Sequence, residues 1–162
     1  MARNLDGQLN ARGLKFAVIA ARFNHFIVDK LVEGALDALA RHGAADGDVT
    51  VIHCPGAFEI PQVARRVVDT GGYDAVICLG CVIRGATTHY DYVAGHAAYG
   101  IAEVAMSAKI PVIFGVLTTE NIEQAVERAG TKAGNKGIDA AMAALEMASL
   151  YTQIDGQAGG KR

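Results

Sequence analysis

The chain has 162 residues, 51% hydrophobic and 20% charged, which suits one packed domain and excludes a disordered chain. Its 15 Lys and Arg residues nearly balance 17 Asp and Glu residues, which argues against a partner that is nucleic acid or an anionic membrane. No apolar run reaches the roughly 18 to 20 residues that span a bilayer, the first residues lack a secretory pattern, and three cysteines suggest no disulfide framework. We therefore expect a cytoplasmic protein with small-molecule partners.

The first half of the chain alternates apolar runs with helical spacing. A strand is predicted at residues 14–20, and an amphipathic helix at 25–42 that ends at Gly43. A second strand at 49–54 precedes a helix that begins near residue 59, has Pro61 in its first turn and stops at the glycine pair 71–72. The continuous Val-rich and Ile-rich runs indicate strands buried on both faces.

The second half repeats the alternation. A strand at 75–81 is followed by a helix at 88–108, and a strand at 112–117 by helices at 121–129 and 137–151, with a glycine-rich bend at 130–137 between them. Strand–helix–strand connections of this length predict right-handed crossovers and a four-stranded parallel sheet. The fold class is therefore α/β, a three-layer sandwich with helices on both faces. We expect one domain over 1–162, with residues 1–13 as an N-terminal arm and 153–162 as a mobile tail.

Ligands of open parallel sheets sit beyond the carboxyl ends of the strands. The turns there are residues 21–24, 55–59, 82–89 and 118–121. In the third turn, the small residues Gly85 and Ala86 precede a helix start, where free N–H groups and the helix dipole attract an anion such as phosphate. From spacing alone a plain helix cap, with Thr88 and Asp91 as a capping box, is the stronger interpretation, since no Walker or dinucleotide motif is present.

His89 lies in the first turn of this helix, and imidazole exchanges protons near neutral pH. Taken alone, it is more simply a solvated helix-start histidine, and only the neighbouring turns favour an acid/base role. Phe23 and Phe58 occupy strand-end turns, where they could stack on a planar heterocycle or belong to the core. Glu59 could accept hydrogen bonds from sugar hydroxyls or complement a helix dipole. The histidines form no metal spacing.

Cys78-x-x-Cys81 lies on a predicted strand, where positions three apart face opposite sides, so core packing explains the pair better than zinc or redox chemistry. Arg128, near the end of a short helix, and the Lys132 and Lys136 pair in the glycine-rich bend could each reach a phosphate or simply be solvated.

Several of these turns together resemble the lumazine synthase family. The resemblance is carried by residues 22–24, 55–61, 80, 82–91, 118–121, 127–130 and 134–137, which read RFN, PGAFEIP, G, VIRGATTHYD, TTEN, ERAG and GNKG. It extends from about residue 12 to 151. It implies a flavodoxin-like fold and condensation of 5-amino-6-(D-ribitylamino)uracil with 3,4-dihydroxy-2-butanone 4-phosphate to 6,7-dimethyl-8-ribityllumazine, phosphate and water, in riboflavin biosynthesis, with no metal and no cofactor.

The resemblance also assigns site residues. It implies His89 as the catalytic proton carrier and, as substrate-binding residues, Phe23, Ala57, Phe58, Glu59, Cys81, Val82, Ile83 and Phe114. It implies a phosphate site of Gly85, Ala86, Thr87 and Arg128, with Lys136 as an auxiliary residue. Cys81 departs from the threonine or other small residue common in relatives, and its thiol could make the enzyme sensitive to oxidation or alkylation.

Members of this family are pentamers, with Phe114 and Arg128 supplied by the adjacent subunit. The resemblance implies the same here, with the N-terminal segment pairing with a neighbouring sheet, and the bend at 130–137 is similar to that of members that form a sixty-subunit icosahedral shell. Riboflavin synthase is a possible partner inside such a shell. The alternatives are a non-catalytic flavin-binding, lumazine-binding or shell protein, and a flavodoxin-like or receiver-type signalling domain. The anion site and His89 argue against the first, and the lack of an acidic cluster in the turns argues against the second.

Overall fold

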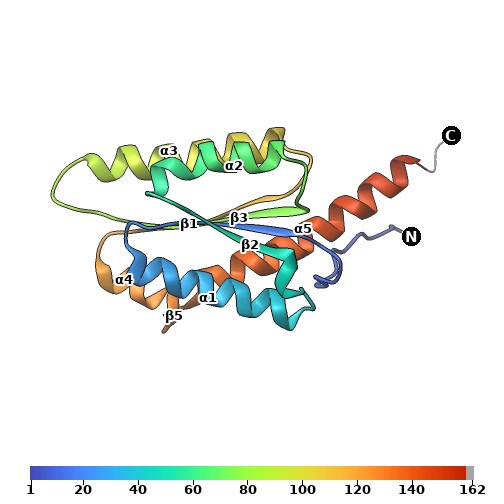
Figure 1. The fold of residues 1–162 in the computed structure, drawn as a ribbon, viewed down its shortest axis with the longest axis horizontal. Helices are drawn as coiled ribbons and strands as arrows, with labels where there is room; N and C mark the ends of the chain where they lie inside the picture. The colour runs from blue at the N-terminus through green and yellow to red at the C-terminus, as the bar shows by residue number, and fades with distance from the viewer. Residues whose placement is uncertain (160–162) are drawn as a thin grey trace.

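The computed structural model of the protein describes residues 1–159, and a central parallel sheet organises it (Figure 1). Its strands are β1 (Phe16–Ala21), β2 (Val49–Cys54), β3 (Ala75–Ile83) and β4 (Val112–Thr119). The order is β2-β1-β3-β4, and each adjacent pair is parallel, so β2 and β4 are the edges of this sheet. The predicted α/β class and four-stranded parallel sheet are confirmed.

Helices cover both faces of the sheet, as Figure 1 shows. The helices α2 (Ile60–Asp69) and α3 (His89–Ser107) lie on one face, and α1 (His25–Arg41), α4 (Ile122–Glu127) and α5 (Lys136–Gly159) on the other. Two 3-10 turns, η1 (Asp46–Asp48) and η2 (Ala57–Glu59), flank β2. The predicted helix boundaries agree within about two residues except at the end of α5. Within residues 1–159 no helix has both the length and the apolar character to cross a membrane.

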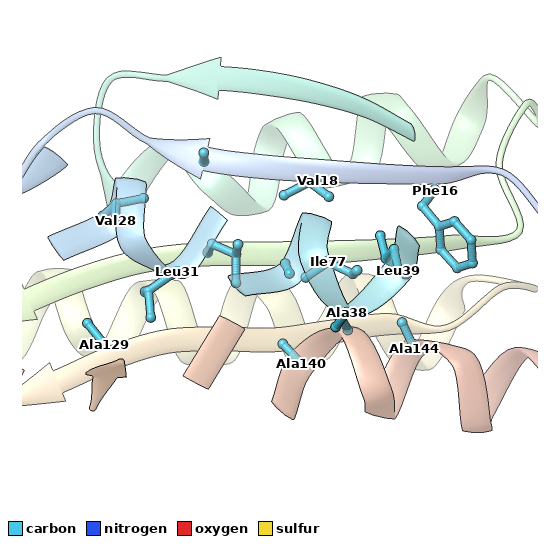
Figure 2. Close-up of a cluster of buried hydrophobic side chains, with 14 of the residues drawn as sticks. Phe16, Val18, Val28, Leu31, Ala38, Leu39, Ile77, Ala129, Ala140 and Ala144 are labelled. Atoms are coloured by element: carbon cyan, nitrogen blue, oxygen red, sulfur yellow. The ribbon is translucent and has the colours of Figure 1, made fainter. Parts of the chain in front are cut away.

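The sheet separates two hydrophobic cores, because successive strand side chains alternate between its faces. On the α1 and α5 side, Phe16, Val18 and Ile77 of the sheet are fully buried in one cluster with Leu31 and Leu39 of α1, and Phe16 lies near Leu39 (Figure 2). Small residues of α5, including Ala140 and Ala144, let that helix approach closely. The α2 and α3 side has its own cluster. Burial on both faces explains why the strands read as unbroken apolar runs.

The segment predicted as a bend is an ordered hairpin of β5 (Ala129–Thr131) and β6 (Gly134–Asn135). Gly130 and Gly134 adopt φ values of 106° and 80°, which glycine tolerates without strain. Asn135 then links two helices: its Nδ2 donates to the Lys30 carbonyl at 3.0 Å, and its Oδ1 accepts from the Gly137 N–H at 2.8 Å. This hairpin therefore places Lys136 at the start of α5, rather than in a flexible basic loop.

The helix α5 continues to Gly159, eight residues beyond its predicted end at 151. The first residues of the chain lie along it, because the Gln8 N–H donates to Ser149 Oγ at 2.9 Å and Gln153 Nε2 donates to the Asp6 carbonyl at 2.7 Å. Residues 153–159, predicted as part of a tail, are thus helical, and residues 160–162 of that tail lie outside the described residues. The predicted arm at 1–13 contains no regular secondary structure.

Candidate active site

All four parallel strands end on the same side of the sheet. We call this side, with the turns that follow the strands, the rim; it lies at the left of Figure 1. Backbone hydrogen bonds connect neighbouring turns along it. The Arg22 N–H donates to the Cys54 carbonyl at 2.8 Å, and the Arg84 N–H donates to the Thr119 carbonyl at 2.8 Å. The turns that the sequence places after separate strands therefore form one continuous surface.

The β1–α1 turn presents an aromatic ring on the rim. The Phe23 side chain is 71% exposed, so the alternative of a core position for this residue is wrong. Asn24 follows in the left-handed region at φ 61°, and its Nδ2 donates to the Cys81 carbonyl on β3 at 2.8 Å. Asparagine tolerates this conformation better than most residues. The bond to β3 fixes the direction of the chain around Phe23.

The end of β3 projects beyond β1 beside this ring. Pairing between β1 and β3 ends at Ala20 and Leu79, whereas pairing between β3 and β4 continues to Ile83 and Thr119. Residues 80–83 therefore extend past β1, and Asn24 takes one carbonyl of this extension. The side chains of Cys81 and Val82 are buried, so what this segment offers to a ligand is chiefly its backbone.

The β2–α2 turn adds a second aromatic residue. Phe58 is 45% exposed and stacks on His96 of α3, with ring centroids 3.9 Å apart and an interplanar angle of 22°. Ala57 is buried, and Glu59 Oε2 lies 3.2 Å from where a Cβ at position 56 would be, with Phe23 Cβ at 3.9 Å from the same point. Phe23 and Glu59 thus flank Gly56, and the two predicted aromatic residues share the rim.

The β3–α3 turn carries the predicted phosphate residues Gly85, Ala86 and Thr87, all exposed, followed by the exposed His89. The predicted capping box is wrong: the Thr88 side chain makes no capping bond, and the His89 N–H donates to Thr87 Oγ1 at 3.3 Å instead. The hydroxyl one residue earlier replaces the cap because Thr88 already has helical φ and ψ. The exposed residues 85–87 before α3 can be reached by an anion from solvent, whereas the His89 N–H already has an acceptor.

His89 and His96 lie on the same face of α3, since seven residues complete nearly two helical turns. His96 contacts Phe58, so this face of α3 is turned toward the β2–α2 turn. His89 is the first residue of α3, at the rim end of that face. The structure thus brings the predicted proton carrier to the same edge as both aromatic residues.

Three predicted site residues lie elsewhere. Phe114, Arg128 and Lys136 line a separate hollow beside the edge strand β4, together with Val116, Leu117, Thr118, Ala133 and Asp139. Phe114 pairs with Cys78, five residues before the rim end of β4, so it lies roughly 16 Å from that end. We call this surface the β4 groove. It runs along β4 from Phe114 to Thr118, so Phe114 lies away from the rim although the groove reaches the rim end of the strand.

An ion-pair cluster on the rim was not anticipated from the sequence. Arg84 contacts Glu120 and Asp91, and its guanidinium carbon lies 4.2 Å from the centre of the Tyr90 ring. Glu120 is 36 residues from Arg84 in sequence. Only the adjacency of β3 and β4 reveals this pair, because no local spacing rule connects the two positions.

The cysteines are free and buried, with Cys78 and Cys81 in the cores on opposite faces of the sheet, as the alternation predicts. Cys81 is 3% exposed, and burial raises its pKa to about 12. Burial also raises the pKa of Cys78 and of Cys54, the latter with help from Glu59. Burial argues against the hypothesis of an alkylation-sensitive thiol at Cys81, because this side chain points into the core and its backbone is what the rim presents.

We expect the folded protein to resist thiol reagents. At pH 8 an ordinary thiol is about one quarter ionised, whereas a thiol of pKa about 12 is ionised in about one molecule in ten thousand, so reactivity at Cys81 appears only as pH rises toward 12. Iodoacetamide followed by mass spectrometry should label no cysteine in the native protein and all three in 6 M denaturant, roughly the concentration that unfolds most domains. Rapid native labelling at Cys81 would contradict the burial described above.

Within residues 1–159, no group of three or more His, Cys, Asp or Glu residues is placed to hold a metal ion. The groups gathered at the rim are instead aromatic rings, backbone donors and acceptors, an open helix start and an imidazole. This set suits a planar polar ring and an anion, and the imidazole is a group that can transfer protons.

The chain is similar to known proteins over most of its length. Residues 13–152 match the family described as 6,7-dimethyl-8-ribityllumazine synthase. A protein of that name from Chlorobaculum tepidum is 61% identical over 152 residues, covering 94% of this chain and 98% of the relative. Proteins of the same name from Chlorobium phaeobacteroides strain DSM 266 and Prosthecochloris aestuarii are 58% and 57% identical over the same shares. The chain therefore belongs to the 6,7-dimethyl-8-ribityllumazine synthase family.

Proposed function

We propose that this protein condenses 5-amino-6-(D-ribitylamino)uracil with 3,4-dihydroxy-2-butanone 4-phosphate, forming 6,7-dimethyl-8-ribityllumazine, phosphate and water in riboflavin biosynthesis. The observation that carries the proposal is the meeting of Phe23, the projecting end of β3 and the open start of α3 at one rim. Membership of the family supplies the identity of the substrates. A non-catalytic binding protein would need no phosphate turn beside its heterocycle site.

The pyrimidine stacks on Phe23, and its polar edge meets the backbone of residues 81–83, with Ile83 at the end of the extension. The ribityl chain extends along Ala57, Phe58 and Glu59, where a carboxylate and a half-exposed ring suit a flexible polyol. The phosphate binds at Gly85, Ala86 and Thr87, because the N–H groups of a helix start and its dipole favour an anion. These side chains and backbone groups hold the two substrates in register.

The reaction then needs a series of proton transfers that one imidazole can serve. The 5-amino group attacks the ketone and water leaves as the imine forms. Phosphate leaves next as the neighbouring carbon loses a proton, the resulting enol becomes a ketone, and the ribitylamino nitrogen attacks this ketone and closes the ring with loss of a second water. His89 lies beside the phosphate turn, where it can take a proton from the attacking amine and return it to the leaving oxygen. Because both substrates are already reactive, binding them in register contributes most of the acceleration.

His89→Ala is expected to lower kcat by about 10- to 100-fold, less than the loss of a general base in a difficult reaction, because positioning is retained. Steady-state kinetics that monitor lumazine absorbance measure this. His25→Ala, which changes an exposed histidine at the start of α1, serves as the control and should leave kcat within about twofold. Complete abolition of activity by His89→Ala would show that His89 does more than assist a reaction driven by positioning.

We further propose a homopentamer whose site is completed by Phe114 and Arg128 of the adjacent subunit, with Lys136 nearby. Two features support it. The β4 groove lies on an edge strand, the kind of surface that pairs with another chain. Tyr92, Tyr99 and Met106 are 72%, 81% and 88% exposed at seven-residue intervals on one face of α3, a stripe typical of helix packing between subunits.

Larger assembly and location follow the same resemblance. We propose that pentamers associate further into an icosahedral shell, in which riboflavin synthase is a candidate guest, and that residues 1–13 act as an arm between subunits. A cytoplasmic location is supported by three free cysteines. We retain a single catalytic domain over residues 1–162.

One experiment tests activity and assembly together. Purified protein mixed with both substrates should produce lumazine absorbance and fluorescence, and light scattering on the same sample should give the mass of a pentamer or a larger shell. Binding of the pyrimidine without product formation would favour the alternative of a non-catalytic lumazine-binding protein. A monomeric mass with full activity would refute the shared site.

A further inference from the structure

The guanidinium of Arg84 makes three contacts at the rim. Its Nε donates to Glu120 Oε2 at 2.8 Å, its Nη1 donates to Asp91 Oδ1 at 3.3 Å, and its carbon lies 4.2 Å from the centre of the Tyr90 ring. Glu120 belongs to the β4–α4 turn, whereas Tyr90 and Asp91 belong to the first turn of α3. One side chain that follows β3 thus joins two neighbouring elements.

These contacts enclose the phosphate turn, residues 85–88, at both ends. At its beginning, the Arg84 N–H donates to the Thr119 carbonyl at 2.8 Å, and at its end α3 is held through Asp91. The turn itself is exposed, and a Cβ at Gly85 would find no atom within 4 Å. Packing therefore contributes little to its shape, and the fixed ends determine where its N–H groups point.

Arg84 is a weaker anion ligand than its charge alone suggests. Two carboxylates already neutralise its single positive charge, which reduces its attraction for a phosphate. Arg128 differs, because its Nη1 donates to the neutral Gln124 carbonyl at 3.0 Å, and the nearest carboxylate, Glu127, is 3.8 Å away. A guanidinium in a fixed fork with two acceptors and a stacked ring is an arrangement that lysine cannot reproduce.

We propose that Arg84 is a positioning residue for the phosphorylated substrate: by joining Glu120 to Tyr90 and Asp91, it holds the phosphate turn and His89 in binding geometry without touching the phosphate. The inference rests on the proposed phosphate site. It assigns Glu120 and Asp91 the same task, as anchors of the guanidinium.

The test compares the Michaelis constants for the two substrates. Arg84→Gln should raise KM for the butanone phosphate about tenfold or more and leave KM for the pyrimidine within about twofold, because the Phe23 side of the rim is untouched. The side chains are 37–60% exposed, so the melting temperature should change by only a few degrees. Equal increases in both KM values would indicate general disruption and overturn the assignment.

Two variants separate positioning from direct binding. Arg84→Lys keeps the charge but cannot hold both carboxylates and the ring, so it should resemble Arg84→Gln. Glu120→Gln should also weaken phosphate binding, since it weakens the ion pair that holds the Arg84 guanidinium in place. If Arg84 were a direct ligand, Arg84→Lys would retain most affinity, and Glu120→Gln would free the guanidinium and tighten binding; either result would overturn the proposal.

Binding of inorganic phosphate by calorimetry gives a readout that does not depend on turnover. Wild-type protein that binds phosphate but lacks synthase activity would contradict the proposed function. The effect of the Arg84 variants on phosphate affinity would still test the positioning role of Arg84. Arg41→Gln is the matched control, because Arg41 makes a similar 2.8 Å ion pair with Asp37 on α1, away from the rim. It should leave phosphate affinity and both KM values unchanged within about twofold.

Discussion

Arg128→Ala is expected to lower kcat/KM by about 100- to 1000-fold, even though Arg128 lines the β4 groove rather than the β3–α3 turn of its own chain. In the proposed pentamer, the β4 groove of one subunit faces the rim of the next. The Arg128 guanidinium in that groove binds the phosphate at the neighbouring rim with charge-assisted hydrogen bonds. Phe23→Ser alters the other side of the same interface, the rim. It should also reduce activity, because the pyrimidine loses its stacking surface.

Co-expression of these two inactive chains should restore activity. In a randomly mixed ring, about one quarter of the interfaces combine an intact rim from one subunit with an intact β4 groove from its neighbour. Activity of the mixed, purified assembly should therefore recover to about a quarter of wild type. Steady-state kinetics on assemblies of measured subunit ratio provide the value.

A matched pair tests the geometry. Phe114→Ala and Arg128→Ala both alter the β4 groove, so no interface in their mixture has an intact groove, and no recovery is expected. Absence of recovery in the first pair, with mixed assembly verified by mass spectrometry, would place Arg128 in the site of its own chain. Recovery in the control pair would show that Phe114 and Arg128 serve different sites.

Gly137→Ala is expected to destabilise the fold by at least about 3 kcal/mol, at the upper end of overpacking effects. Gly137 is buried in the first turn of α5, and a Cβ there would overlap the backbone carbonyl of Leu31 in α1. The obstacle is backbone rather than a mobile side chain, so α5 would have to move away from α1 and open the core shown in Figure 2. Urea unfolding followed by circular dichroism at one fixed protein concentration measures the change.

Gly156→Ala is the control in the same helix. Gly156 is exposed, and a Cβ there would meet no atom within 4 Å, so helix propensity alone should apply and stability should rise by up to about 1 kcal/mol. A Gly137→Ala protein as stable as wild type would mean that α1 and α5 can separate at no cost, contrary to their close approach here.

Local sequence patterns predicted every strand and helix of the main sheet, because apolar runs and helix stops such as Gly43 act over a few residues. The alternation of a strand also predicted that Cys78 and Cys81 face opposite cores. Where long-range contacts compete with local signals, the predictions were wrong. In the hairpin of β5 and β6, Asn135 bonds to the Lys30 carbonyl of α1. The last turns of α5, which continue past Gly156 to Gly159, are accompanied by contacts with the N-terminal arm.

The sequence by itself determined the α/β class, the four turns that bear the candidate site, and the residue types available there. The tertiary structure decided which of those residues meet. Phe58 stacks on His96, Asn24 bonds to Cys81 and Arg84 pairs with Glu120, each across tens of residues. It also placed Phe114 in the β4 groove, away from the rim end of that strand. Strand order and register set these contacts, and both arise from packing of the whole chain, which no short segment encodes.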